Sequence, residues 1–286
     1  MSAESHASPA SQAEQRPLER QLAADEKDGV LWLTLDRPEA GNAITPDQRN
    51  RLIDLLNAAS ERVEVRAVVI TATGRHFCTG ADLRASRAQP DRPDGVPDRV
   101  DGDVRRTLRQ GAQRLVDAVL DCDKPVVAAV NGTAAGLGAH LALACDIVLV
   151  AESARFIEVF VRRGLVPDAG GCWLLPRLVG LQRAKELMFF GDAVSAEDAE
   201  RWGLVNRVVP PDELAEVAAA WAARLAAGPT RAIALTKSLL NRSLESDRAT
   251  AFLEEGAAQE LNVATRDANE GLAAFAERRD PVFRGW

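Results

Sequence analysis

The sequence predicts an α/β protein that ends in a helical region. Short apolar runs of strand length, partly β-branched, alternate with segments whose apolar residues recur at helical spacing. Strands that alternate with helices are typical of α/β architecture. From Ser195 onward helical patterns dominate, and only one further strand is predicted. The 286 residues, of which 47% are hydrophobic, are enough to bury a sizeable core.

Local patterns place the strands and the first long helix. The predicted strands are residues 30–35, 66–72, 125–130, 146–151 and 204–209. Between the first two, Thr45 can cap a helix, Pro46 fits its first turn and Gln48 completes a capping box. Farther along, the apolar residues from Val104 to Val119 have the spacing of one continuous helix.

The chain divides into three parts. Residues 1–24 lack apolar periodicity and are expected to form a disordered or loosely held tail. Residues 25–210 hold the strands and form the predicted core, and residues 211–286 form a helical C-terminal region. Within the core, residues 84–103 are charged and rich in proline, which predicts a surface loop of the kind that often covers a binding site.

The composition argues against several partners and compartments. With 35 Lys and Arg against 42 Asp and Glu, the net charge is −7, so nucleic acid and anionic membranes are not expected partners. No apolar run approaches the about 20 residues of a membrane-spanning helix, and the N-terminal stretch lacks the apolar centre of a signal peptide. The widely spaced Cys78, Cys122, Cys145 and Cys172 form no CxxC pair. A cytoplasmic protein with reduced thiols is therefore expected.

Several common catalytic motifs are missing from the sequence. The glycines of NGTAAGLG are spaced GxxxGxG, so Leu141 stands where a dinucleotide fingerprint has its last glycine. There is no tyrosine, no phosphate-binding loop and no GxSxG nucleophile turn. The histidines His6, His76 and His140 are scattered, so no metal site is predicted. The chemistry is therefore expected from carboxylates, a histidine and backbone dipoles.

Two turns rich in small residues are suited to binding an anion through the main chain. HFCTGADL (His76–Leu83) and NGTAAGLGAHL (residues 131–141) each follow a strand-like run. Small residues let a ligand approach main-chain N–H groups, and two such turns aimed at one point would form an oxyanion hole. Close packing of a helix on a sheet also requires small residues, so both interpretations stay open.

Asp168 also allows two interpretations. In GLVPDAGG, Pro167, Asp168 and Gly170 have the chemistry of an ordinary turn. The same aspartate could instead offer its carboxylate to a substrate.

Several of these segments occur together, and in the same order, in one protein family. The crotonase, or enoyl-CoA hydratase/isomerase, superfamily has motifs that resemble DRPEAGNAI, GRHFCTGADL, KPVVAAVNGTAAGLGAHLALACDIVLV, ARFIEVFVRRGLVPDAGGCWLLPRLVG, GDAVSAEDAERWGLVNRVVP and the ending RRDPVFRGW. The resemblance covers residues 25–286. It implies a crotonase-like spiral of ββα units and C-terminal helices that assemble a homotrimer or homohexamer. It also implies an acyl-CoA substrate, with coenzyme A entering as part of that substrate and no separate cofactor.

The resemblance assigns roles to particular positions. It places the oxyanion-hole N–H groups at Ala81 and Leu137. The two glutamates of the hydratases correspond to His140 and Phe160, which departs from the hydratase pattern. Phe160 is expected in the substrate pocket, and Glu158 lies two residues before it on what alternation makes the same face.

The segment around Asp168 is similar to isomerases of this family that act on ring-epoxidised phenylacetyl-CoA, whose catalytic aspartate occupies this position. The resemblance thus implies an isomerase that shifts a double bond or a ring epoxide, with Asp168 as proton shuttle. One alternative is a hydratase that uses Asp168 with Glu158 or His140. Another is a catalytically silent acyl-CoA-binding protein. Arg84 and Arg87, after the GADL turn, are expected to contact CoA.

Overall fold

The predicted strands lie side by side in one mainly parallel sheet. The computed structural model describes residues 16–84, 95, 97 and 100–286. In this part of the chain the sheet order is β1 (Leu22–Lys27), β2 (Val30–Leu35), β3 (Ala67–Ala72), β5 (Val126–Val130), β7 (Ile147–Ala151) and β10 (Arg207–Val209). β1 is antiparallel to β2, and the other pairings are parallel. The predicted strands are confirmed, although the last is shorter than expected.

A second, smaller sheet is built from four short strands, two of which lie within the predicted turns. Its order is β4 (His76–Cys78), β6 (Thr133–Ala135), β8 (Arg155–Ile157) and β9 (Ala193–Ser195). The chain runs from a strand of the large sheet to a strand of the small one and then into a helix, as in β5, β6 and α6 (Leu137–Leu143). The pairs β3–β4 and β7–β8 repeat this course, which confirms the predicted spiral of ββα units.

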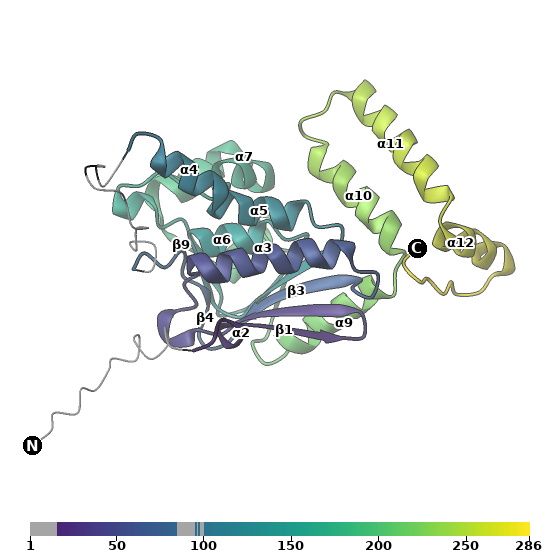
Figure 1. The fold of residues 1–286 in the computed structure, drawn as a ribbon, viewed down its shortest axis with the longest axis horizontal. Coiled ribbons are helices and arrows are strands. Elements are labelled where there is room, and N and C mark those ends of the chain that lie inside the picture. Colours follow the sequence, from purple (N-terminus) through teal and green to yellow (C-terminus); the bar gives the residue numbers. More distant parts are fainter. Residues whose placement is uncertain (1–15, 85–94, 96, 98–99) are drawn as a thin grey trace, which may run out of the picture.

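Helices cover both faces of the large sheet (Figure 1). Val68 and Ile70 of β3 pack into the larger core with α3 (Pro46–Glu61), α5 (Ala112–Leu120) and α6. Val69, between them in the sequence, packs on the opposite face with α9 (Leu214–Ala226). Because successive strand residues point to opposite faces, one apolar run supplies both cores.

The start of α3 was predicted correctly. The Gln48 N–H donates to Thr45 Oγ1, and the Thr45 N–H donates to Gln48 Oε1, each at 3.2 Å. This reciprocal pair satisfies donors that the first turn of a helix would otherwise leave without acceptors.

The remaining helices lie around the small sheet and at the C-terminus. α7 (Gly171–Phe190) follows β8, and α8 (Ala196–Arg201) follows β9. The shortest helical segments are the α-helix α2 (Leu18–Gln21) and the 3-10 helices η1 (Pro38–Ala40) and η3 (Val161–Arg163). α10 (Thr230–Arg242), α11 (Arg248–Val263) and α12 (Arg266–Glu277) stand to one side of the sheets (Figure 1). None of the helices in the described ranges combines the length and apolar character needed to cross a bilayer.

Two predicted boundaries were wrong. The tail was expected to extend to residue 24, but β1 begins at Leu22, whose side chain is fully buried. The last three residues of β1 are charged, so the strand lacks an apolar pattern that the sequence could show. It forms because its main chain pairs with β2. The helix expected from Val104 to Val119 is divided at Gly111 into α4 (Asp103–Gln110) and α5, and Val104 is 46% exposed.

Candidate active site

The turn after β4 directs one main-chain N–H away from its neighbouring segment. Ile44 and Ala81 form an isolated parallel bridge. In this bridge the Ile44 N–H donates to the Gly80 carbonyl, and the Asp82 N–H donates to the Ile44 carbonyl, each at 2.9 Å. Since the two residues that flank Ala81 make these bonds, Ala81 directs its own N–H to the opposite side of the strand.

The second turn leads from β6 into α6. Leu137 is the first residue of α6, and the first N–H groups of a helix have no acceptor within the helix. Gly136 precedes it with a positive φ of 53°, and its N–H donates to the Ile157 carbonyl of β8 at 3.0 Å. The Leu137 side chain is buried in the core, so only the main chain of this residue is expected to meet a ligand.

The two turns are in direct contact. A Cβ placed on Gly80, whose φ is 117°, would lie 3.3 Å from the Ala135 carbonyl oxygen and 4.0 Å from the Leu137 nitrogen. A Cβ on Gly138 would lie 2.2 Å from the Cys78 carbonyl oxygen, a distance that atoms do not adopt. The structure thus brings the segments of Ala81 and Leu137 together, and glycine at 138 is what allows the approach. That the two N–H groups bind an oxyanion stays a prediction.

A histidine and a glutamate form a buried pair beside these turns. His140 Nε2 lies 3.0 and 3.2 Å from the two carboxylate oxygens of Glu158, and the side chains are 0% and 6% exposed. The His140 ring also stacks on Phe160, with ring centres 5.4 Å apart. Its Nδ1 is buried and has no hydrogen-bond partner among the described residues. Gly171 leaves the space for the ring, because a Cβ there would lie 2.1 Å from His140 Nε2.

Asp168 lies near this pair but is less deeply buried. Burial raises the pKa of the Asp168 carboxyl above its usual range, and the charge interaction with His140 opposes this rise. The N-cap of α7 is Gly170, and no side chain caps the helix. Asp168 therefore does not serve the following helix as a cap. Its carboxylate does accept a hydrogen bond from its own main chain, so the turn interpretation stays open beside the catalytic one.

Sequence reasoning missed one member of this neighbourhood, Cys172. Burial and then the charge of Glu158 raise the pKa of its thiol. Cys172 is the second residue of α7 and follows Asp168 by four positions, which was the available signal. Sequence reasoning also missed the buried ion pair of Arg37 and Asp82 next to the first turn.

The two predicted CoA contacts are only partly covered by the structure. Arg84 is exposed, and its main-chain N–H donates to Asp82 Oδ1 at 3.0 Å. Arg87 and most of the predicted lid loop lie outside the described residues. Among the residues that are described, no group of three or more His, Cys, Asp or Glu side chains is arranged to hold a metal ion.

Comparisons with known proteins show which family and which proteins this chain resembles. The family described as enoyl-CoA hydratase/isomerase matches residues 25–285. A probable enoyl-CoA hydratase of Rhodobacter capsulatus is 40% identical over 258 residues, which cover 90% of this chain and 95% of that protein. The 1,2-epoxyphenylacetyl-CoA isomerase of Escherichia coli K12 is 38% identical over 257 residues, with the same coverage of 90% and 95%. The crystal structure of a putative enoyl-CoA hydratase from Streptomyces coelicolor A3(2) superposes with a TM-score of 0.85 at 37% identity, covering 100% of both chains.

Proposed function

The chain belongs to the enoyl-CoA hydratase/isomerase family, and we propose that within it this protein is an isomerase of enoyl-CoA thioesters. One observation carries the preference for isomerisation. Both carboxylate oxygens of Glu158 lie within 3.2 Å of the buried His140 Nε2, so Glu158 is occupied by the histidine. Asp168 is then the carboxylate of this cluster that is left to face a substrate.

Such an isomerisation needs one acid–base group and one site for negative charge. Asp168 removes a proton from the carbon next to the thioester carbonyl, and the electron pair moves onto the carbonyl oxygen to give a dienolate. The N–H groups of Ala81 and Leu137 stabilise that oxygen. The protonated Asp168 then delivers the proton to the far carbon of the conjugated system, which moves the double bond and regenerates the carboxylate.

Hydration places a further demand on the site. A water molecule must be positioned and deprotonated while another group protonates the neighbouring carbon, and family hydratases use two glutamates for this. Here Phe160 occupies one of those positions and packs against His140, which occupies the other. The pairing of Glu158 with His140 removes the nearest substitute.

The preferred acyl group follows from the same comparison. The Escherichia coli relative that resembles this chain at 38% identity is named for a ring-epoxidised substrate, which supports an unsaturated or epoxidised ring as the acyl group. Phe160, whose ring stacks on the buried His140 ring at an interplanar angle of 14°, is the aromatic group beside the acidic cluster against which a ring could pack.

Hydration remains the second candidate because of one specific feature. The buried Nδ1 of His140 has no partner among the described residues, and a water molecule is one group that could bond there. The name of the Rhodobacter capsulatus relative points the same way. A catalytically silent acyl-CoA-binding protein is the third candidate.

Product analysis in isotopically labelled water separates these candidates. A panel of straight-chain and ring-containing enoyl-CoAs is incubated in H₂¹⁸O, and products are identified by mass and by NMR. We expect a positional isomer of unchanged mass without ¹⁸O. A product that carries ¹⁸O would contradict the isomerase proposal and support hydration, and binding without turnover across the panel would support the silent protein.

We also propose that the C-terminal helices assemble the protein into trimers or hexamers. Large apolar side chains there are exposed, among them Phe275 at 87% and Leu253 at 74%. Exposed large apolar side chains gathered on α11 and α12 suit a surface that a partner subunit covers. Light scattering at micromolar concentration tests the proposal, and a mass near the 30.7 kDa of one chain would contradict it.

A further inference from the structure

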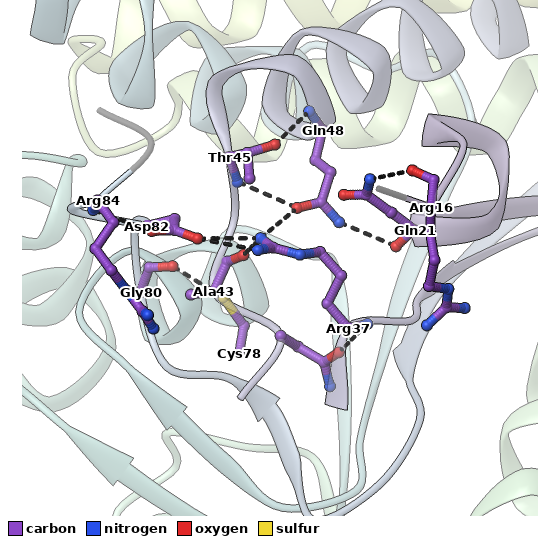
Figure 2. Close-up of polar contacts among 11 residues, drawn as sticks. Arg16, Gln21, Arg37, Ala43, Thr45, Gln48, Cys78, Gly80, Asp82 and Arg84 are labelled. Atoms are coloured by element: carbon purple, nitrogen blue, oxygen red, sulfur yellow. Dashed lines mark hydrogen bonds and ion pairs between the residues drawn. The ribbon is translucent and has the colours of Figure 1, made fainter. Parts of the chain in front are cut away.

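A buried arginine joins the first turn of the site to the rest of the fold. The Arg37 side chain is 2% exposed, and its Nη1 and Nη2 donate to Asp82 Oδ2 at 3.2 and 3.1 Å. Figure 2 shows the guanidinium group lying between Asp82 and Gln48. Asp82 directly follows Ala81, so the ion pair acts on the neighbour of the proposed oxyanion donor.

Asp82 is held through both its side chain and its main chain. Its Oδ2 accepts from Arg37, its Oδ1 accepts from the Arg84 N–H at 3.0 Å, and its own N–H donates to the Ile44 carbonyl at 2.9 Å. The peptide plane between Ala81 and Asp82 therefore cannot rotate without breaking several of these bonds at once. The Ala81 N–H lies in the preceding peptide plane, between Gly80 and Ala81, whose carbonyl oxygen accepts from the Ile44 N–H at 2.9 Å. Its direction therefore depends on both peptide planes of this bridge, and the ion pair holds the second of them.

Arg37 is itself fixed by groups that do not belong to the site. Its Nη1 also donates to the Ala43 carbonyl at 2.9 Å and contacts Gln48 Oε1 at 3.4 Å. Gln48 caps α3 and donates through Nε2 to the Gln21 carbonyl at 2.9 Å. The ion pair thus ties the turn of Ala81 to the start of α3, as the dashed contacts in Figure 2 make visible.

We propose that Arg37 and Asp82 are positioning residues that aim the Ala81 N–H at the thioester oxygen. Neither side chain is proposed to touch the substrate. Because their opposite charges cancel at close range, they act on the direction of the Ala81 N–H and not on the electrostatic field at the thioester oxygen. A planar guanidinium, which holds several N–H donors in a fixed arrangement, can bridge these acceptors. A lysine ammonium at position 37 would lack that fixed arrangement of donors. The inference rests on the proposed function, because it presupposes an oxyanion at Ala81.

The test compares the vibrational frequency of a bound thioester carbonyl with kinetics. A non-reactive acyl-CoA carrying a ¹³C=O label is bound to wild type, Arg37→Lys and Asp82→Asn, and the carbonyl stretch is measured by infrared difference spectroscopy. Aligned N–H donors lower this frequency, so we expect a smaller lowering in both variants. Turnover should fall by about 10- to 100-fold, part of the effect of losing one oxyanion donor, while the Kd of the ligand changes by less than about threefold.

A second ion pair, whose lysine is buried and whose aspartate side chain is 22% exposed, supplies a control. Lys237 Nζ lies 2.9 Å from Asp146 Oδ2, and its side chain is 6% exposed. Asp146 lies beyond the carboxyl end of α6, whereas Leu137 begins that helix. Lys237→Met breaks a charge pair, as Asp82→Asn does, and should lower the melting temperature with the carbonyl frequency unchanged.

The outcomes separate the inference from the proposed function. Variants with the wild-type carbonyl frequency, or a loss of turnover that Lys237→Met reproduces, would make Arg37 and Asp82 merely structural and overturn the inference. If Arg37→Lys does not fold, Asp82→Asn decides alone, because it keeps an oxygen to accept the Arg84 N–H. A wild-type carbonyl at the frequency of free ligand would instead contradict the proposed oxyanion site, and the inference would fall with it.

Discussion

The two turns of the site and its acidic cluster are built in different ways. The turns, Gly80–Asp82 and Gly136–Gly138, present main-chain groups. Hydrogen bonds to neighbouring segments hold them, and glycines without side chains let them approach each other closely. The acidic cluster, His140, Glu158 and Asp168, consists of side chains that contact or influence one another. The turns are therefore sensitive to added volume, and the cluster is sensitive to changes of charge at constant volume.

The largest effect is expected from changing the charge of Asp168. Asp168→Asn keeps the shape of the side chain but removes the base, so turnover should fall by about 10²–10⁴-fold, the usual contribution of a positioned acid–base group. Steady-state turnover on an isomerised substrate, with the melting temperature measured alongside, checks this. Wild-type turnover in the variant would return Asp168 to the role of a turn residue, for which asparagine is an adequate substitute.

The corresponding change to a turn is one added methyl group. In Gly138→Ala the new Cβ meets the Cys78 carbonyl oxygen at 2.2 Å, so the start of α6 must move away from β4. Misplacement of the Leu137 N–H should reduce turnover by about 10²–10³-fold, as loss of an oxyanion donor does. Unlike Asp168→Asn, this variant should also unfold more easily, by about 1–3 kcal/mol. Equal activity and stability to wild type would show that the two turns need no close contact.

The sequence predicts the turns better than it predicts the acidic cluster. Apolar runs of strand length placed five of the six strands of the large sheet. The small residues at Gly80, Gly136 and Gly138 indicated turns that approach a neighbour. The short strands β4, β6 and β8 escaped detection, because three residues are too few for periodicity to appear.

The acidic cluster was predicted only as separate candidates. His140 and Glu158 are eighteen positions apart, and nothing local in the sequence shows that their side chains meet. The same holds for Arg37 and Asp82, which look like ordinary surface charges until the fold buries both. Pairings between distant side chains depend on the packing of β8 against α6 and of the turn against α3, which local patterns do not encode.

A milder test of the cluster removes the charge of Glu158 while keeping its shape. Under isomerisation, Glu158 acts only through His140, so Glu158→Gln should lower turnover by about 10-fold, in line with losing one charge-assisted hydrogen bond. If hydration were the reaction, the loss should instead approach that of Asp168→Asn. Turnover of both variants on one substrate, compared side by side, decides between these outcomes.

The raised pKa of Asp168 predicts a pH-dependent difference in stability. A carboxyl whose pKa is higher in the folded protein stabilises the fold fully below its unfolded pKa of about 3.9 and loses this contribution as pH rises through the folded value. The melting temperature of Asp168→Asn should therefore be about 1–3 °C above that of wild type at pH 7. This difference in melting temperature should disappear toward pH 4. Thermal melts of both proteins across this range check the sign, which a capping or turn-forming role for Asp168 would reverse.

The smallest effect is expected at the rim, where the first turn meets solvent. Arg84 is exposed, and its bond to Asp82 uses the main chain, so its side chain can be shortened without disturbing the turn. If the guanidinium contacts a CoA phosphate, Arg84→Ala should weaken CoA binding by only about two- to fivefold, the size typical of an exposed ion pair, and the loss should shrink as salt screens the charges. Calorimetry at two salt concentrations measures both quantities, with Arg207→Ala, an exposed arginine of β10, as the matched change of charge. Equal losses in the two variants would mean that Arg84 contributes only to the overall charge, and the turn would then hold the substrate through its main chain alone.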